Sequence, residues 1–201
     1  RFRGDENAIR ERQRRYLECF RGHEPVVDLG CGRGEFLELL RQAGIEAWGI
    51  EQDGSFVELC RHKGLQVEPG DLFEVLERQP DEALGGAFCS HLVEHLPPPQ
   101  LPRLLDLLAR KLKRDGTLVI ETPNPECLVI FATHFYLDPT HTRPVPPALL
   151  SFYLEEAGFG RIQLELLAPA AEAVPELEEL PAGVRRRLFG YLDYALIAQR
   201  L

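Results

Sequence analysis

Several residue types and sequence patterns are rare or absent in this chain, and each absence excludes a class of protein. Its 201 residues include no methionine and one tryptophan. No apolar run approaches the ~20 residues that a membrane-spanning helix needs. The first residues also lack the apolar stretch of a signal peptide. We therefore expect a cytoplasmic protein without a membrane span.

Cysteine is also scarce, and its spacing argues against two common uses. The five cysteines are an odd number, and none of them forms a CxxC pair. Disulfide frameworks and zinc knuckles depend on paired cysteines at characteristic spacings. We expect reduced and mostly buried thiols at these positions: Cys19, Cys31, Cys60, Cys89 and Cys127.

Positive charge is the third shortage. The chain has 23 basic and 32 acidic side chains, which gives a formal net charge of −9. A protein that binds duplex nucleic acid needs a positive surface to neutralise phosphates, so we expect no such partner. The first 21 residues are a local exception, with seven arginines against four acids. This segment is either a solvated helix face or a basic lid that meets an anionic group.

What the sequence does contain is a regular alternation of strand and helix patterns. Short apolar runs predict strands over 25–29, 45–50, 65–67, 84–89, 117–121, 162–167 and 191–198. Apolar residues at helical spacing predict helices over 5–20, 35–43, 55–63, 72–78, 101–113, 147–157 and 172–187. Ten of the 16 prolines lie between Pro97 and Pro147, so we expect much of that stretch to be loop. The alternation predicts one α/β domain over 1–201, with a mostly parallel sheet and helices on both faces.

A glycine-rich segment, residues 28–35, connects the first predicted strand to the helix that follows it. Its sequence, DLGCGRGE, differs from the GxGxxG dinucleotide fingerprint because the third glycine comes one residue early and Glu35 follows it. The carboxylates of Asp28 and Glu35 make a poor cradle for a pyrophosphate and a better one for the ammonium group of an amino acid. The segment therefore favours S-adenosylmethionine (SAM), and a dinucleotide-dependent oxidoreductase is the weaker alternative.

Two further acids lie where a nucleoside would need them. Glu51 follows the second strand, where a carboxylate can accept from both ribose hydroxyls. Asp71 follows the third strand, where it can accept from an adenine amino group while Leu72 packs against the ring. In open parallel sheets, ligands bind at the carboxyl ends of the strands. The predicted cofactor contacts are Asp28, Gly30, Cys31, Gly32, Gly34, Glu51, Gln52, Asp71, Leu72 and Ser90. Among them Cys31 is expected to be a small filler rather than a nucleophile.

Together these motifs resemble those of class I SAM-dependent methyltransferases, over a stretch from about residue 25 to 159. The chain is similar to the bacterial branch that contains ubiquinone-type O-methyltransferases and methyltransferases of O-antigen and other surface polysaccharides. The resemblance is carried by residues 26–34, 70–72 (GDL), 93–96 (VEHL), 121–126 (ETPNPE) and 134–141 (HFYLDPTH). Residues 2–4 (FRG), with Arg12 and Tyr16, resemble the N-terminal helix that covers the cofactor in the surface-polysaccharide group.

The resemblance implies a fold and an activity. Such families have seven strands with the last one antiparallel, so we expect a Rossmann-like sheet, a helical lid over 1–24 and an acceptor-side loop over 123–147. SAM would be the methyl donor, S-adenosylhomocysteine the product, and Arg12 and Tyr16 cofactor contacts. The expected acceptor is an oxygen of a sugar, a polysaccharide end or a small molecule. A glycosyltransferase or another biosynthetic enzyme is a candidate partner, and a non-catalytic SAM-binding subunit of such an assembly is an alternative.

Four of the six histidines form two clusters, His91 with His95 and His134 with His141. His91 and His95 are four residues apart, so on one helical turn they would share a face, with Glu94 nearby. In one interpretation His95 only caps or packs the turn and His91 is incidental. In a second, His95 or His141 accepts the proton of an acceptor hydroxyl near neutral pH. In a third, Glu94, His95 and a later histidine such as His141 hold a divalent ion.

The metal alternative is supported by a second resemblance. Small-RNA 3′-end 2′-O-methyltransferases have a similar arrangement, in which a Glu, three residues and a Glu-His pair are followed by a later His. Here His91, or its neighbour Ser90, takes the place of the first Glu. A metal-dependent RNA 2′-O-methyltransferase is therefore a further alternative. The net charge of −9 counts against a long RNA-binding surface.

The acceptor itself is expected to bind on the side of the proline-rich stretch. His134, Tyr136 and Arg143 lie there, close in sequence to His141. We therefore predict that these three side chains contact the acceptor. A rigid surface loop with a few polar side chains is the alternative for each of them.

Overall fold

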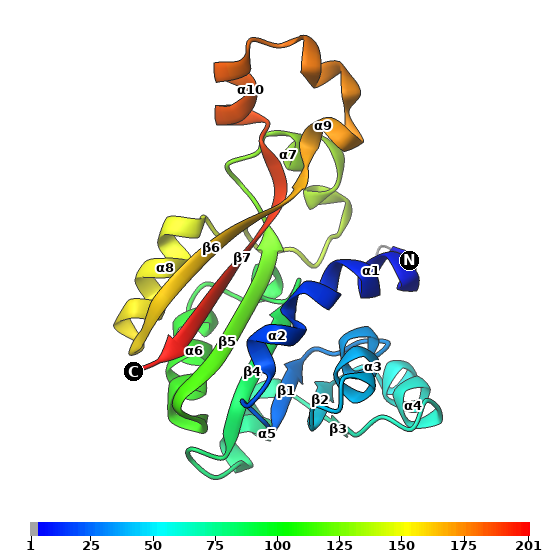
Figure 1. Ribbon diagram of the computed structural model, residues 1–201, viewed down its shortest axis with the longest axis vertical. Coiled ribbons are helices and arrows are strands. Elements are labelled where there is room, and N and C mark those ends of the chain that lie inside the picture. Colours follow the sequence, from blue (N-terminus) through cyan, green and yellow to red (C-terminus); the bar gives the residue numbers. More distant parts are fainter. Residues whose placement is uncertain (1–3) are drawn as a thin grey trace.

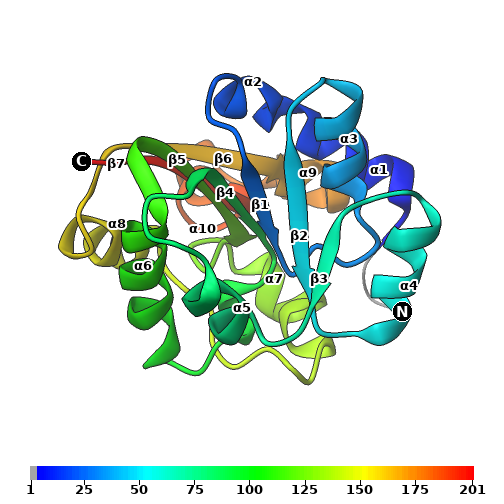
Figure 2. The ribbon, with the colours of Figure 1, turned by 90° about the horizontal axis from the view of Figure 1, so that it is seen from below.

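The protein consists of a single twisted sheet flanked by helices, described by a computed structural model over residues 4–201 (Figures 1 and 2). Its strands are β1 (Val26–Leu29), β2 (Ala47–Glu51), β3 (Val67–Pro69), β4 (Leu84–Ser90), β5 (Leu112–Pro123), β6 (Phe159–Pro169) and β7 (Tyr191–Arg200). The strand order is β3-β2-β1-β4-β5-β7-β6, and β7 runs antiparallel to both of its neighbours. The predicted fold class is confirmed, including the antiparallel last strand.

The helices lie on both faces of the sheet and beyond one of its ends. They are α1 (Glu6–Gln13), α2 (Leu17–Phe20), α3 (Glu35–Gln42), α4 (Gly54–His62), α5 (Leu72–Arg78), α6 (Gln100–Lys111), α7 (Val129–Thr133), α8 (Pro147–Glu156), α9 (Ala170–Ala173) and α10 (Ala182–Leu188). The main core packs α5, α6 and α8 against one face, and a second core packs α2 and α3 against the other (Figure 2). Among residues 4–201 no helix is both long and apolar enough to pass through a bilayer.

The central strands β1 and β4 are buried because they are short apolar runs covered by helices on both faces. All four residues of β1 are buried, since this strand lies in the middle of the sheet between β2 and β4. Apolar side chains of β1 alternate between the two cores: Val27 and Leu29 lie in the main core and Val26 in the second. This central position places the end of β1 next to the ends of β2 and β4, where a ligand would bind.

Several predicted boundaries are wrong in instructive ways. The helix predicted over 5–20 is divided into α1, the 3₁₀ turn η1 (Arg14–Tyr16) and α2, and the tighter turn directs Tyr16 into the core. The helix predicted over 101–113 ends at Lys111, because the chain then enters β5, which is longer than the predicted strand. The helical excursion predicted over 172–187 is present as α9, the 3₁₀ turn η4 (Pro175–Glu179) and α10.

A separate small core holds two segments together beyond the end of the sheet. We call these segments, residues 124–143 and 170–190, the cap; they lie at the top of Figure 1. The first contains α7 and the 3₁₀ turn η3 (Phe135–Leu137), and the second contains α9, η4 and α10. The buried residues of the cap core are Cys127, Val129, Ile130, Phe135, Ala170 and Leu177. Much of the predicted acceptor-side loop is therefore packed structure rather than free loop.

Candidate functional site

The glycine-rich segment after β1 has a backbone that requires glycine. Gly30, Gly32 and Gly34 all have positive φ, at 68°, 54° and 79°. A Cβ added to Gly34 would also lie 2.4 Å from Cδ1 of Leu65, so the position has no room for a side chain. The amides of Gly30 and Cys31 donate to the carbonyl of Ile50 at 2.9 and 3.1 Å, which ties the loop to β2.

Glu51, the last residue of β2, is fixed beside this loop. Its Oε2 accepts from the amide of Gly32 at 2.7 Å, and its Oε1 accepts from the amide of Asp53 at 2.9 Å. A carboxylate has about four lone-pair sites, so each oxygen retains acceptor capacity for a hydroxyl. This geometry fits a carboxylate that holds a ribose. Gln52, the next residue, is exposed.

Asp71 and Leu72 begin α5. Asp71 is its N-cap, with Oδ1 accepting from the amides of Phe73 at 2.9 Å and Glu74 at 3.2 Å. Leu72 is partly buried against the main core. The structure therefore gives Asp71 a capping function, and its contact with adenine stays a prediction. Ser90, at the end of β4, lies at the same sheet edge.

Glu35 and Cys31, two residues of the loop with reactive side chains, already interact with other side chains of the protein. The Glu35 carboxylate pairs with Nε of Arg33 at 2.7 Å, so it is already compensated. Cys31 is buried, and both a hydrogen bond with Cys60 and burial raise the pKa of its thiol. A protonated thiol is a poor nucleophile, which agrees with a filler function for Cys31. Asp28 is buried at the end of β1.

The N-terminal segment begins with α1 beside the glycine loop, and its α2 packs with α3 against one face of the sheet (Figure 1). Between α1 and α2 the Tyr16 hydroxyl donates to Oε2 of Glu121 at 2.6 Å, and the Tyr16 ring centroid lies 5.5 Å from that of Phe88. Burial, with a smaller contribution from Glu121, raises the pKa of Tyr16, so the hydroxyl stays protonated. Nη1 of Arg12 lies 3.8 Å from Oδ2 of Asp193. In the structure the two predicted cofactor contacts thus face carboxylates of β5 and β7, and their contact with SAM stays a prediction.

Glu121 and Asp193 are functional candidates that sequence reasoning did not single out. Both are buried in the sheet, Glu121 near the end of β5 and Asp193 near the start of β7. Burial raises the pKa of Asp193, while the pKa of Glu121 is lowered by His91 and Tyr16 against the effect of burial. The sequence did contain a signal for both residues, because each is an acid within an otherwise apolar strand pattern. Residues 2 and 3, which were expected to belong to the lid, lie outside the described residues.

His91 does not share a helical turn with His95, so that prediction is wrong. The 3₁₀ turn η2 is Val93–His95, and His91 precedes it with a φ of 50°, which turns its side chain toward β5. Its Nδ1 lies 3.2 Å from Oε1 of Glu94, and its Nε2 lies 3.4 Å from Oε1 of Glu121. Burial acts to lower the pKa of His91, but the two carboxylates outweigh it and the pKa is raised well above its ordinary value.

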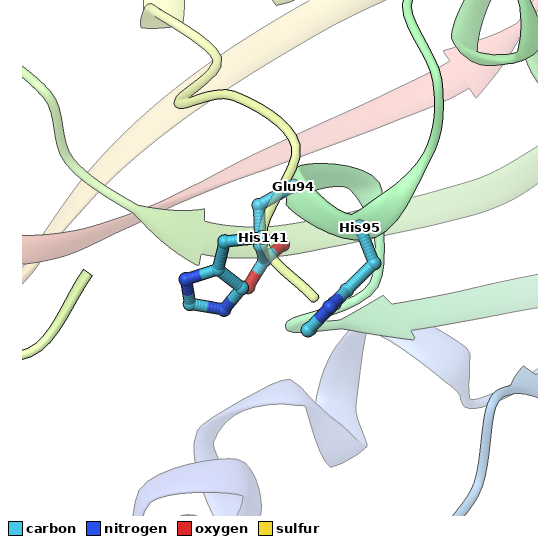
Figure 3. Close-up of side chains that lie close together, drawn as sticks. All are labelled: Glu94, His95 and His141. Atoms are coloured by element: carbon cyan, nitrogen blue, oxygen red, sulfur yellow. The ribbon is translucent and has the colours of Figure 1, made fainter. Parts of the chain in front are cut away.

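Glu94, His95 and His141 form the compact cluster shown in Figure 3. One ligand atom of each residue lies within 4.8 Å of the others, and the two imidazole centroids are 4.6 Å apart. The loop that carries His141 is held to η2 by Thr142, whose amide donates to the carbonyl of Glu94 at 2.8 Å. The buried Glu94 accepts at Oε2 from the Thr122 hydroxyl at 2.9 Å. Residues from two distant segments are therefore brought together, as predicted for Glu94, His95 and His141.

Hydrogen bonds around the cluster fix which imidazole nitrogens carry protons. Nδ1 of His141 lies 2.6 Å from the carbonyl of Phe135, which can only accept, so this nitrogen donates. Nδ1 of His95 lies 2.8 Å from the Thr140 hydroxyl, which donates its own proton to Asp138 at 2.5 Å. His95 must therefore donate to Thr140. Each Nδ1 is thus a donor, and in the neutral form of an imidazole the remaining nitrogen, Nε2, is an acceptor.

The electrostatic environment keeps His95 neutral. Burial lowers its pKa from the ordinary histidine value, and the neighbouring His141 lowers it further, against the opposing effect of Glu94. At neutral pH the Nε2 atom of His95 is thus a proton acceptor or a metal ligand. Both chemical alternatives derived from the sequence are compatible with this geometry.

The three predicted acceptor contacts lie in or beside the cap. Tyr136 is 70% exposed, with its ring 6.0 Å from that of Phe131. His134 is half-buried, its Nδ1 is 2.7 Å from the Thr133 hydroxyl, and burial lowers its pKa. Arg143 is half-buried, and its amide donates to the carbonyl of Glu94 at 3.4 Å. Their contact with an acceptor stays a prediction.

Comparison with known proteins gives a consistent result. Residues 2–164 match the family model described as "Methyltransferase domain". A SAM-dependent methyltransferase from Archaeoglobus fulgidus has a solved structure that is 38% identical, covers 99% of this chain and 96% of its own, and superposes with a TM-score of 0.90. Another from Mesorhizobium loti shares the fold at 18% identity and a TM-score of 0.65, covering 92% of this chain and 97% of its own.

A curated relative adds a hint about chemistry. The ubiquinone biosynthesis O-methyltransferase of Methylococcus capsulatus is 33% identical over 105 residues, which are 49% of this chain and 43% of that protein. The match thus spans less than half of the relative's length.

Proposed function

This chain belongs to the SAM-dependent methyltransferases, and on that premise we propose that it methylates a hydroxyl oxygen of a sugar, a polysaccharide end or a small molecule. The observation that carries the oxygen assignment is the pair of imidazoles, His95 and His141, that cluster with Glu94. A hydroxyl must lose its proton on methylation, and a neutral imidazole can take it. The partial match to an O-methyltransferase supports the same choice.

Two features support a SAM site at the ends of β1 and β2. The glycine loop has positive φ at Gly30, Gly32 and Gly34, and Glu51 is oriented by two backbone amides while retaining acceptor capacity. We assign the ribose to Glu51, the adenine to Asp71 and Leu72, and the amino-acid end to the loop that begins at Asp28. When bound, SAM supplies a sulfonium-linked methyl group, and its sulfur leaves as S-adenosylhomocysteine when the acceptor oxygen bonds to the methyl carbon.

His95 is proposed as the group that receives the acceptor proton at Nε2. Its Nδ1–H is held by Thr140, which is in turn held by Asp138, so the ring is oriented and its tautomer is set. His141 and Glu94 border the same space, and His141 packs on His95. Positioning of the two reactants supplies a further part of the rate enhancement.

The cap is proposed as the acceptor-binding region. A chain of ring contacts connects His95, His141, Phe135 and the exposed Tyr136. An exposed aromatic ring next to polar groups suits a sugar ring, which has apolar faces and hydroxyl edges. His134 and Arg143 would contribute polar contacts. A biosynthetic partner enzyme, such as a glycosyltransferase, would present the acceptor here.

The test is methyl transfer from SAM to a panel of free sugars, oligosaccharides and phenols. We expect S-adenosylhomocysteine release and an O-methylated product with at least one of them, and loss of turnover in His95→Ala. Methylation of nitrogen or carbon instead would overturn the oxygen assignment. Binding of S-adenosylhomocysteine without turnover on any acceptor would favour the non-catalytic alternative.

A metal-assisted variant is a second candidate, because three ligand atoms of suitable type converge within 4.8 Å. Glu94, His95 and His141 resemble a His₂–carboxylate set, and a divalent ion there would polarise the acceptor hydroxyl. Activity that is lost with a chelator and restored by zinc or magnesium would select this variant. Activity unaffected by a chelator would select the imidazole base. A short RNA in the acceptor panel tests the 2′-O-methyltransferase alternative.

A further inference from the structure

Within residues 4–201, three buried side-chain polar atoms have no hydrogen-bond partner. Two of them, Nε2 of His91 and Oε1 of Glu94, border the site already described. The third is Oε1 of Gln13, a buried residue at the end of α1. A buried acceptor without a partner costs folding free energy, so such an atom marks a position where a bound molecule could supply the missing donor.

The contacts of α1 place Gln13 over the cofactor site. At its start, Arg33 of the glycine loop donates to the carbonyl of Gly4 at 3.1 Å, and Arg10 pairs with Glu38 of α3. At its end, Tyr16 reaches Glu121 at the end of β5. In the strand order, β1 and β4 lie between these two attachments. Gln13 therefore lies above the carboxyl ends of β1 and β4.

Helix periodicity gives the direction of the side chain. Gln13 is four residues after Ile9 and three before Tyr16, and all three are buried. Residues at these spacings share one face of a helix. Arg10, by contrast, is partly exposed and pairs with α3. The amide of Gln13 thus faces the sheet edge rather than solvent.

Two acids near the loop are already paired with the protein's own cations. Glu35 interacts with Arg33, and Glu38 of α3 interacts with Arg10 and Lys63. The amino-acid end of SAM carries an ammonium donor and a carboxylate acceptor. A carboxamide offers an acceptor oxygen and an NH₂ donor, so it can serve both without adding charge.

We propose that Gln13 binds the amino-acid end of SAM, with Oε1 accepting from its ammonium group. This inference rests on SAM binding, which the family establishes, and adds a ligand that neither the glycine loop nor the acids after β2 and β3 provide. It also gives the N-terminal lid a direct function in cofactor binding. Arg12 and Tyr16, by contrast, contact the protein's own carboxylates.

The test compares two probes in calorimetry. S-adenosylhomocysteine has the amino-acid end, and 5′-methylthioadenosine keeps the nucleoside but lacks that end. Hydrogen bonds to charged groups are stronger than neutral ones, so we expect Gln13→Leu to weaken S-adenosylhomocysteine binding by about tenfold or more. Binding of 5′-methylthioadenosine should change by less than about twofold. The exposed Gln42→Leu in α3 is the matched control and should leave both affinities unchanged.

Thermal unfolding without any nucleoside gives an independent readout. Gln13→Leu removes an unpartnered buried acceptor, so the variant should be as stable as the wild type or more stable. Weaker cofactor binding together with equal or higher stability supports the proposal, because a merely structural residue would lose stability. If Gln13→Leu does not fold, Gln13→Ala takes its place in the same two measurements.

Two results would overturn the inference. In one, Gln13→Leu weakens both probes equally, so the residue does not act on the amino-acid end. In the other, it leaves S-adenosylhomocysteine binding unchanged. In either case the wild type still binds S-adenosylhomocysteine and transfers methyl groups. Failure of the proposed function is distinct, since it would appear as a wild type that binds but produces no O-methylated acceptor.

Discussion

The two halves of the site are built in different ways. The cofactor half, at the ends of β1, β2 and β3, consists mainly of backbone: three glycines with positive φ and a carboxylate, Glu51, held by two amides. The acceptor half, at the ends of β4 and β5 and the start of β7, consists of buried titratable side chains such as His91, Glu94 and Glu121. The first half can bind with little rearrangement, and the second can move protons. Each of the first two predictions below affects one half and leaves the other as its control.

The largest expected effect is on turnover in the acceptor half. His95→Ala should lower kcat by about 10²–10⁴-fold, because the hydroxyl loses its proton acceptor. The affinity for S-adenosylhomocysteine should be nearly unchanged, since Glu51 and the glycine loop are intact. Steady-state kinetics and calorimetry measure the two effects. His62→Ala, an exposed histidine at the end of α4, is the control. Full activity in His95→Ala would remove this residue from the mechanism.

The next effect belongs to the cofactor half. Glu51→Gln should weaken S-adenosylhomocysteine binding by roughly tenfold, because a neutral amide accepts more weakly from the ribose hydroxyls than a carboxylate does. At saturating SAM, kcat should fall far less than in His95→Ala. The exposed Glu58→Gln in α4 is the matched control. Unchanged affinity in Glu51→Gln would contradict the ribose assignment.

A smaller effect is expected where the two halves are joined. Tyr16→Phe removes the hydroxyl that donates to the buried Glu121 and leaves that carboxylate oxygen short of a partner. The free energy of unfolding should fall by about 1–3 kcal/mol, measured by urea denaturation. Tyr153→Phe, a partly buried ring on α8, should change it much less. An equally stable Tyr16→Phe would show that the lid does not depend on this hydrogen bond.

The smallest effect is the pH dependence near neutrality. The pKa of His95 is lowered by burial, so the base is neutral at and above its ordinary value of about 6.5. The rate should therefore rise with pH only below that value and be flat between about pH 7 and 8. Because folding depresses this pKa, protonation of His95 also destabilises the folded state as the pH falls below 6.5. A rate that still rises steeply above pH 7 would contradict this assignment.

The division into a cofactor half and an acceptor half also explains which features could be predicted from the sequence. The glycine loop, Glu51 and Asp71 lie after strands as predicted, because each follows directly on a strand pattern and local sequence determines its position, while their contacts with SAM stay a prediction. Glu94, His95 and His141 were grouped correctly through resemblance. The contact between Tyr16 and Glu121 joins residues 105 positions apart, and no local pattern specifies it. The backbone turn at His91 and the Thr140 bond that sets the His95 tautomer depend on how distant loops pack.

The second segment of the cap, residues 170–190, is joined to the sheet in a way that would allow its replacement by another segment. Pairing of β6 with β7 ends at Pro169 opposite Tyr191, so the chain leaves the sheet for α9 and returns from α10 at adjacent points. The small core of the cap is separate from the two that support the cofactor half. A segment of different length could therefore connect the end of β6 to the start of β7 without disturbing the glycine loop. In this way one nucleoside-binding scaffold could diversify to serve many acceptors.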